Sequence, residues 1–249
     1  MAEGPLLVVN GVESRLQIVL GDGDGVLWSH ESTAPGRLMT RLAPALEWMF
    51  KAFDLSVTDL GGIAAVRGPG SFTGVRLVLA TMLGLSRGGT VPQAGLDYLP
   101  LLAAGPATLL HGELWVCTHA RQGQVYLQGF TCPHAEPVHP ARAVGLEEAA
   151  SLLAARSLPL HLVGSGCRKN QDWLHSHGLD QVLLPPVWDH PATALLLACA
   201  RGAAFSNTPV TPCYLRSSDA EENLPGIAAG RGLSEEEARR GLTDFELPG

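Results

Sequence analysis

Apolar and polar positions along the chain fall into short blocks that predict strands first and helices afterwards. Apolar runs over 5–9 and 16–20, and a third over 26–29, are joined by turns rich in glycine and aspartate. Short strands with such turns are typical of an antiparallel meander. The run over 63–66 is apolar at every position, which predicts a strand that is buried on both faces.

Two apolar helices are predicted beside these strands. Over 38–53 apolar side chains recur at spacings of three and four, which predicts one buried stripe, with a kink or a restart at Pro44. A second helix over 74–86 is apolar around nearly its whole circumference. Because a sheet covers only one face of a helix, we favour a partner interface over simple burial. The expected interface residues are Leu38, Leu42, Leu46, Met49, Val75, Val78, Leu79 and Met82.

The pattern begins again after Gly105-Pro106, which we interpret as a domain boundary. The elements expected there are strands over 114–119, 124–130, 158–163 and 181–184, and helices over 146–155, 168–175 and 191–205. Each half is predicted to hold strands first and then helix, strand and helix. This order predicts an α/β protein of the actin-like ATPase fold with mixed sheets, built from ribonuclease-H-like subdomains over 1–105 and 106–218.

Charge is concentrated at one end of the 249-residue chain. The net charge is −7, and the segment 219–249 holds eight acidic and three basic residues. We expect this segment to be a flexible tail, and we favour a solubilising role over mimicry of RNA phosphates or binding of a partner. An acidic chain without a basic face is a poor nucleic-acid binder on its own, so contact with RNA is expected to be indirect.

Targeting and redox features favour a cytoplasmic location. No apolar run reaches the roughly 18 residues that a membrane span requires, and the first ten residues lack the pattern of a signal peptide. The five cysteines are widely spaced and form no Cys-x-x-Cys pair, which is typical of reduced thiols in a cytosolic protein.

A glycine-rich turn follows the buried strand at 63–66. It consists of Gly68, Pro69, Gly70, Ser71, Phe72, Thr73 and Gly74, with Arg76 in the helix behind it. Free N–H groups at a helix start can hold an anion. However, the spacing is neither that of a Walker A loop nor that of a nucleophile elbow. We favour helix capping by Ser71 or Thr73, with the glycines allowing close packing, over phosphate binding, which stays open.

The stretch 67–76, Arg-Gly-Pro-Gly-Ser-Phe-Thr-Gly-Val-Arg, resembles the signature of the TsaB (YeaZ) family. Three later stretches agree with that family in order and spacing: 120–126, the strand–Gly-x-Gly turn at 163–166 with Gly164 and Gly166, and the Pro-x-Tyr-Leu-Arg pattern at 212–220. Members of this family belong to the bacterial machinery that places threonylcarbamoyl on the tRNA adenosine next to the anticodon.

The resemblance implies a subunit without catalysis of its own. It implies a heterodimer with the transferase TsaD, a further ATPase subunit, TsaE, in the assembled complex, and contact with tRNA only through these partners. A homodimer through the two apolar helices stays open. The family has carried a glycoprotease label, but no His-Glu-x-x-His pattern occurs here, so we expect neither a metal site nor peptidase activity.

Two of the departures from the family pattern concern nucleotide chemistry. Asn10 and His119 stand where the family has aspartate, and neither can supply the negative charge that organises Mg²⁺ around nucleotide phosphates. We therefore expect no required cofactor, while binding of ATP or ADP stays open. The alternative hypothesis is a nucleotide-binding transferase or kinase-like enzyme of the actin fold, with the turns at 68–74 and 164–166 as phosphate loops.

Overall fold

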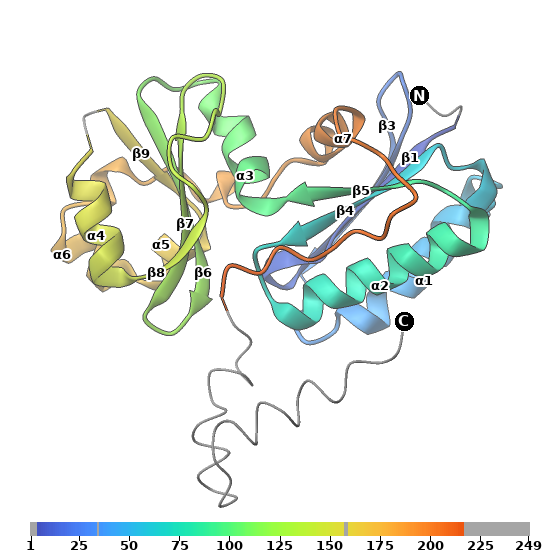
Figure 1. Ribbon diagram of the computed structural model, residues 1–249, viewed down its shortest axis with the longest axis horizontal. Helices are drawn as coiled ribbons and strands as arrows, with labels where there is room; N and C mark the ends of the chain where they lie inside the picture. The colour runs from blue at the N-terminus through green and yellow to red at the C-terminus, as the bar shows by residue number, and fades with distance from the viewer. Residues whose placement is uncertain (1–3, 34, 157–158, 217–249) are drawn as a thin grey trace, which may run out of the picture. The chain divides into compact units, whose positions relative to one another are not determined.

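The computed structural model describes residues 4–33, 35–156 and 159–216. The elements belong to one compact unit, Met1–Leu215, which Figure 1 shows in ribbon form. The tail expected over 219–249 lies outside the described residues. Among the residues that are described, no helix is both long enough and apolar enough to cross a membrane.

The first sheet has five strands in the order β3-β2-β1-β4-β5. The strands are β1 (Leu6–Asn10), β2 (Arg15–Gly21), β3 (Val26–Thr33), β4 (Gly62–Gly68) and β5 (Gln93–Asp97). Short turns make the first three antiparallel, whereas β4 and β5 run parallel to β1 because helices provide the crossovers. The predicted meander and the buried strand β4 are therefore confirmed.

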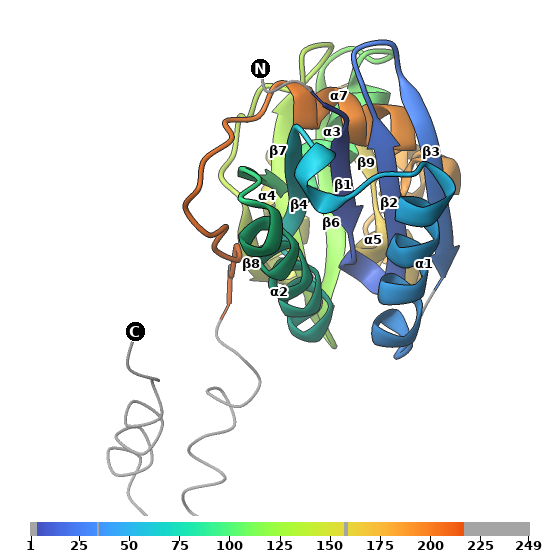
Figure 2. The same ribbon diagram turned by 90° about the vertical axis from the view of Figure 1, so that its right-hand side faces the viewer.

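Two pairs of helices cover the two faces of this sheet. The helices α1 (Leu38–Ala52) and α2 (Phe72–Gly89) lie beside each other on one face, and α3 (Tyr98–Ala107) and α7 (Thr193–Arg201) lie on the other (Figures 1 and 2). The predicted restart at Pro44 is wrong, since α1 is continuous through it. Buried Leu42 and Leu46 hold the helix on the sheet on both sides of the exposed proline.

The second sheet has the order β8-β7-β6-β9, which repeats the first four positions of the first sheet. Its strands are β6 (Glu113–Arg121), β7 (Gln124–Thr131), β8 (Arg142–Gly145) and β9 (Leu160–Val163), followed or joined by the helices α4 (Leu146–Ala154), α5 (Ser165–Lys169) and α6 (Gln171–Ser176). Short 3₁₀ turns occur at Val12–Ser14, Val57–Asp59, Asp180–Val182 and Pro186–Trp188. The strand expected over 181–184 is wrong: this segment makes only an isolated bridge, between Leu162 and Leu183.

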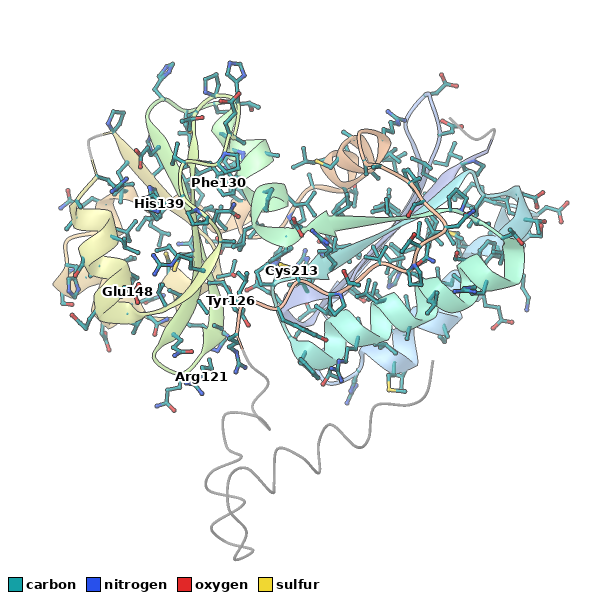
Figure 3. All side chains as sticks on the ribbon, in the orientation of Figure 1. Arg121, Tyr126, Phe130, His139, Glu148 and Cys213 are labelled. Carbon is teal, nitrogen blue, oxygen red and sulfur yellow. The ribbon has the colours of Figure 1, made fainter. Side chains whose placement is uncertain are left out.

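Side chains of β6 alternate between two cores, as the period of a strand requires. Leu114 and Val116 join the core that surrounds α3 and the first sheet, and Tyr126 and Phe130 of β7 belong to the same core (Figure 3). Trp115 joins a second core under α4, α5 and α6. Two sheets with the same strand order, each covered by helices, confirm the predicted tandem of ribonuclease-H-like units in the actin-like fold.

Two sequence interpretations near the middle and end of the chain need correction. Gly105-Pro106, interpreted as a domain boundary, lies inside the last turn of α3. The helix α7, expected to complete the second half, packs instead on β1 and β2 of the first sheet. Gly21 explains the contact, because a Cβ there would lie 2.3 Å from Cδ2 of the buried Leu197.

Candidate functional site

The glycines of the turn 68–74, between β4 and α2, allow neighbouring segments to pack closely against the turn. A Cβ at Gly70 would lie 2.5 Å from Cγ1 of Val12, and one at Gly74 would lie 2.6 Å from the carbonyl oxygen of Gly11. Gly68 has φ +106°, and its added Cβ would lie 3.0 Å from the carbonyl oxygen of Cys213. The turn is thus pressed between the loop after β1 and the C-terminal segment.

Ser71 caps the helix that follows this turn. Its Oγ accepts the N–H of Gly74 at 3.4 Å, and its carbonyl oxygen accepts the N–H of Val75 at 2.9 Å. Ser71, rather than the exposed Thr73, is therefore the capping residue. The favoured interpretation, capping with close packing, agrees with this geometry, whereas anion binding by the turn stays a prediction.

Two of the sequence motifs meet on the surface beside α2. The rings of Phe72 and Tyr214 stack with centroids 4.9 Å apart, and the guanidinium carbon of Arg76 lies 3.6 Å from the Phe72 centroid. Arg76 Nε donates to the Tyr214 hydroxyl at 2.8 Å. Both rings are more than one-third exposed. Aromatic residues and arginine of this kind are enriched in protein interfaces.

The eight residues predicted for a partner interface lie inside the chain. None of them is more than 9% exposed, because they fill the space between α1, α2 and the first sheet. This part of the prediction is corrected: these side chains are used in the core and leave little area for a partner. The set is Leu38, Leu42, Leu46, Met49, Val75, Val78, Leu79 and Met82.

Among the described residues, nothing covers the outer faces of the same two helices. On α2 this face carries exposed Ala80, Gly84 and Gly88, and a Cβ at either glycine would meet nothing within 4 Å. On α1, Met39 and Trp48 are 69% and 57% exposed. One side of α2 therefore forms the core, and the other carries the small residues Ala80, Gly84 and Gly88 between the exposed Arg76 and Arg87.

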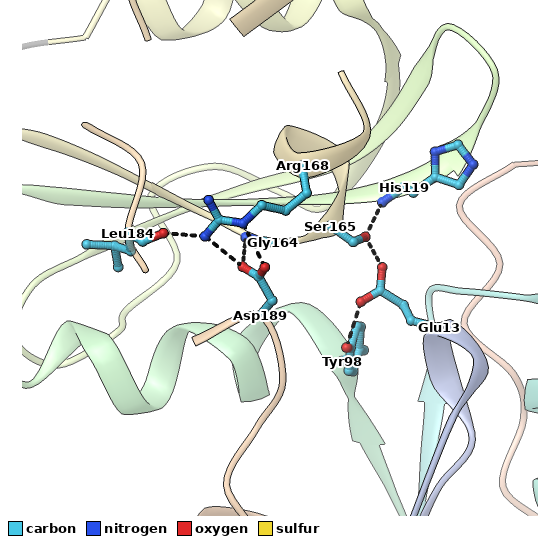
Figure 4. Close-up of polar contacts among 8 residues, drawn as sticks. All are labelled: Glu13, Tyr98, His119, Gly164, Ser165, Arg168, Leu184 and Asp189. Atoms are coloured by element: carbon cyan, nitrogen blue, oxygen red, sulfur yellow. Dashed lines mark hydrogen bonds and ion pairs between the residues drawn. The ribbon is translucent and has the colours of Figure 1, made fainter. Parts of the chain in front are cut away.

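The first and second sheets are joined by the carboxylate of Glu13, which lies just after β1 (Figure 4). The hydroxyl of Tyr98 donates to Glu13 Oε2 at 2.9 Å, and the hydroxyl of Ser165 donates to Oε1. The backbone N–H of His119 donates to Ser165 Oγ at 3.0 Å. Elements 152 residues apart in the chain are thus linked through one side chain.

The environment of Glu13 is unusual for a carboxylate. Burial raises its pKa above the ordinary 4.5, although the hydrogen bonds from Ser165 and Tyr98 and the nearby Lys169 oppose the rise. Its backbone is left-handed, with φ 58° and ψ 37°. Such a conformation in a residue other than glycine is often found at functional sites. Glu13 is not predicted as a site residue from the sequence, because a single acidic residue in a turn carries no motif.

The Gly-x-Gly turn after β9 is used for contacts inside the chain. Gly164 has φ +116°, and a Cβ there would lie 2.5 Å from the carbonyl oxygen of Cys117; a Cβ at Gly166 would lie 2.8 Å from the same atom. The N–H of Gly164 donates to Asp189 Oδ1 at 3.0 Å, and Arg168 Nε donates to Oδ2 at 2.9 Å. The two predicted glycine turns lie on different sheets, each fixed by its own packing.

Asn10 and His119 lie at the carboxyl ends of β1 and β6. Asn10 is buried: its Oδ1 accepts the N–H of Val12 at 3.0 Å, and its Nδ2 donates to Gln17 at 2.8 Å. The pKa of His119 is lowered by burial and by the charge of Lys169, which keeps the ring neutral at pH 7. Neither residue supplies negative charge.

No group of three or more His, Cys, Asp or Glu side chains that could hold a metal ion occurs in the part of the chain that the structure describes. The five cysteines lie there without a disulfide bond.

Comparison with known proteins places these features in context. Residues 33–135 match the family model described as TsaD, tRNA N6-adenosine threonylcarbamoyltransferase. The Escherichia coli K12 tRNA threonylcarbamoyladenosine biosynthesis protein TsaB is 29% identical over 82% of this chain and 91% of its own length. The Bacillus subtilis 168 protein of the same name is 26% identical over 87% of this chain and 96% of its own length.

A solved structure supports the fold. It is an uncharacterised Pseudomonas aeruginosa protein with similarity to the peptidase YeaZ, which aligns with a TM-score of 0.67 at 20% identity over 86% of this chain and 100% of that one. Similarity along most of the sequence, the shared fold and the contact between the signature and the closing motif agree with one another. Over most of its length the chain is similar in sequence to the TsaB proteins of Escherichia coli and Bacillus subtilis.

Proposed function

We propose that this chain is a non-catalytic, cytoplasmic subunit that binds TsaD and activates it for threonylcarbamoyl modification of the tRNA adenosine adjacent to the anticodon. The names of its relatives, tRNA threonylcarbamoyladenosine biosynthesis protein TsaB, support a role in this modification. In the proposed assembly TsaE and tRNA are reached through TsaD, and the chain itself requires no cofactor.

The observation that carries the non-catalytic part is the position of Glu13. Its carboxylate accepts a hydrogen bond from the Ser165 hydroxyl, and Asp189 accepts one from the N–H of Gly164. These donors of the Gly-x-Gly turn are therefore already paired with acceptors inside the chain. A phosphate brought to this turn would meet the Glu13 carboxylate, and like charges in a buried setting repel strongly. With Asn10 and His119 neutral, no carboxylate is free at the ends of β1 and β6 to hold Mg²⁺.

The outer face of α1 and α2 is the surface we propose for TsaD. Small residues on α2 allow the helix of a partner to approach closely, and the exposed Trp48 and Met39 supply apolar area. Activation then follows if these contacts are stronger with the active arrangement of TsaD than with its other arrangements. The same face serves a second copy of this chain when TsaD is absent.

Co-purification of tagged TsaD with this chain tests the proposal. Ala80→Glu and Gly84→Glu place a charge on the exposed face of α2 without touching the core, and each should abolish the complex. Ala154→Glu, on the exposed side of α4, is the matched control and should leave it intact. Circular dichroism would verify that all three variants stay folded. Survival of the complex in both α2 variants would contradict the proposed surface.

Calorimetry with ATP and Mg²⁺ tests the alternative hypothesis, a nucleotide-binding enzyme of the actin fold. The subunit proposal expects no Mg²⁺-dependent binding and no turnover. Tight binding followed by hydrolysis or transfer would favour the enzyme instead.

A further inference from the structure

A cavity of about 640 Å³ lies between α3, the start of α7 and the segment 186–192. This volume is within the range of small-molecule sites, about 300–1,000 Å³. Most of its lining is apolar: Leu101, Leu102, Pro106, Pro186, Val187, Trp188, Pro191, Ala192 and Leu195. Arg15, Glu31 and His190 form the polar part of the wall. The cavity is separate from the outer face of α1 and α2.

The segment that forms one wall is fixed at several points. Asp189 accepts hydrogen bonds from Gly164 and Arg168 (Figure 4), and the carbonyl oxygen of Pro191 accepts Gln17 Nε2 at 2.8 Å. Trp188 packs on α3, where a Cβ at Gly105 would lie 3.2 Å from its Cζ3. The absence of a side chain at Gly105 thus leaves room for the ring of Trp188. A wall held in this way makes the cavity preformed.

The polar part of the wall offers donors and one open acceptor. Arg15 Nε donates to Glu31 Oε1 at 2.5 Å, and Gln17 Nε2 reaches the same oxygen at 3.3 Å. Within the described residues, Glu31 Oε2 has no hydrogen-bond donor, and Nδ1 of His190 is buried without a partner. Burial, and next the charge of Arg15, lower the pKa of His190, so its ring is neutral at pH 7.

The charge balance of this wall selects a neutral ligand. The charges of Arg15 and Glu31 compensate each other, so the wall offers little net charge to an anion or a cation. A flat ring with a donor and an acceptor on one edge can donate to Glu31 Oε2 and accept from the remaining N–H groups of Arg15. The faces of such a ring lie against the apolar side chains of the cavity. We propose that this cavity binds a neutral heteroaromatic compound of the purine type, for which guanosine is the probe.

Titration calorimetry of the full chain with guanosine tests this inference, with ribose as the control ligand. Guanosine should bind with a Kd of about 1 mM or tighter, and ribose should give no heat. Glu31→Gln should weaken guanosine binding about tenfold, because it removes the carboxylate acceptor. Val187→Trp, which fills the cavity mouth from a position that is 76% exposed, should abolish binding.

Glu47→Gln is the matched control, since Glu47 forms an exposed ion pair with Lys51 on α1, away from the cavity. It should bind guanosine like the wild type. Absence of binding at millimolar guanosine, equal binding of ribose, or full binding by Val187→Trp would each overturn the inference. The variants lie at exposed positions, and their unfolding curves would verify that the fold is retained.

Discussion

The carboxylate of Glu13 connects elements that are far apart in the chain, and its removal should weaken the fold. Glu13→Ala leaves the hydroxyls of Ser165 and the fully buried Tyr98 without their acceptor. A hydrogen bond to a charged group contributes about 1.5–3 kcal/mol, and the cost of burying the carboxylate offsets part of the two bonds. We expect Glu13→Ala to lower the free energy of unfolding by roughly 2–4 kcal/mol at pH 7.

Glu13→Gln separates the hydrogen bonds from the charge. Glutamine can accept one hydroxyl proton and donate to the other oxygen, so it keeps the shape of the network. The raised pKa of Glu13 means that the folded protein retains a proton that the unfolded chain releases above pH 4.5. The free energy of unfolding of the wild type therefore falls as pH rises through that raised pKa, and this contribution is absent in Glu13→Gln.

Urea unfolding followed by circular dichroism, at several pH values from 4.5 to neutral, measures both effects. The stability of Glu13→Gln relative to the wild type should grow with rising pH and then level off, because all other groups titrate alike in the two proteins. A difference that is constant or shrinks with rising pH would refute the argument about the charge. A loss below about 0.5 kcal/mol in Glu13→Ala would refute the importance of the hydrogen bonds.

Five further substitutions test the packing, each by urea unfolding. Tyr214→Ala should cost about 1–2 kcal/mol through lost stacking on Phe72 and the lost contact with Arg76, and Tyr214→Phe should cost less than half as much; equal costs would contradict a role for the ring. Gly164→Ala should cost about 2–4 kcal/mol, because its Cβ would lie 2.5 Å from the Cys117 oxygen at φ +116°, whereas Gly145→Ala, which meets nothing within 4 Å, should be near neutral. Gly84→Ala should stabilise by about 0.5–1 kcal/mol, and a loss would show that the outer face of α2 is not open.

Periodicity predicted most of the elements of this fold. The apolar residues that define β1, β2, β4 and the buried stripe of α1 lie close together in the sequence. A short window of sequence is therefore enough to recognise these elements. The repetition of strands followed by helices then indicated two related units. The place of α7 could not be obtained this way, because its contact with Gly21 joins residues far apart in the chain.

The interface prediction failed for a different physical reason. Apolar residues that face the chain's own sheet and apolar residues that face a partner are chemically alike, so composition alone could not show that Leu79 is buried and Ala80 exposed. The three-dimensional structure separates them: Leu79 is 9% exposed and Ala80 lies on the open face. Glu13 escaped notice because its role depends on Tyr98 and Ser165, which only the fold brings to it.

Reconstituted threonylcarbamoyl transfer to tRNA by TsaD tests the central proposal most directly. TsaD from the same organism, TsaE, tRNA and an activated threonylcarbamoyl donor would be combined and assayed without further addition, with the wild-type chain, with Gly84→Glu and with Ala154→Glu. We expect modification to require the chain, to be lost with Gly84→Glu and to persist with Ala154→Glu. Equal modification with and without the chain, or full activity with Gly84→Glu, would contradict a subunit that activates TsaD through the outer face of α2.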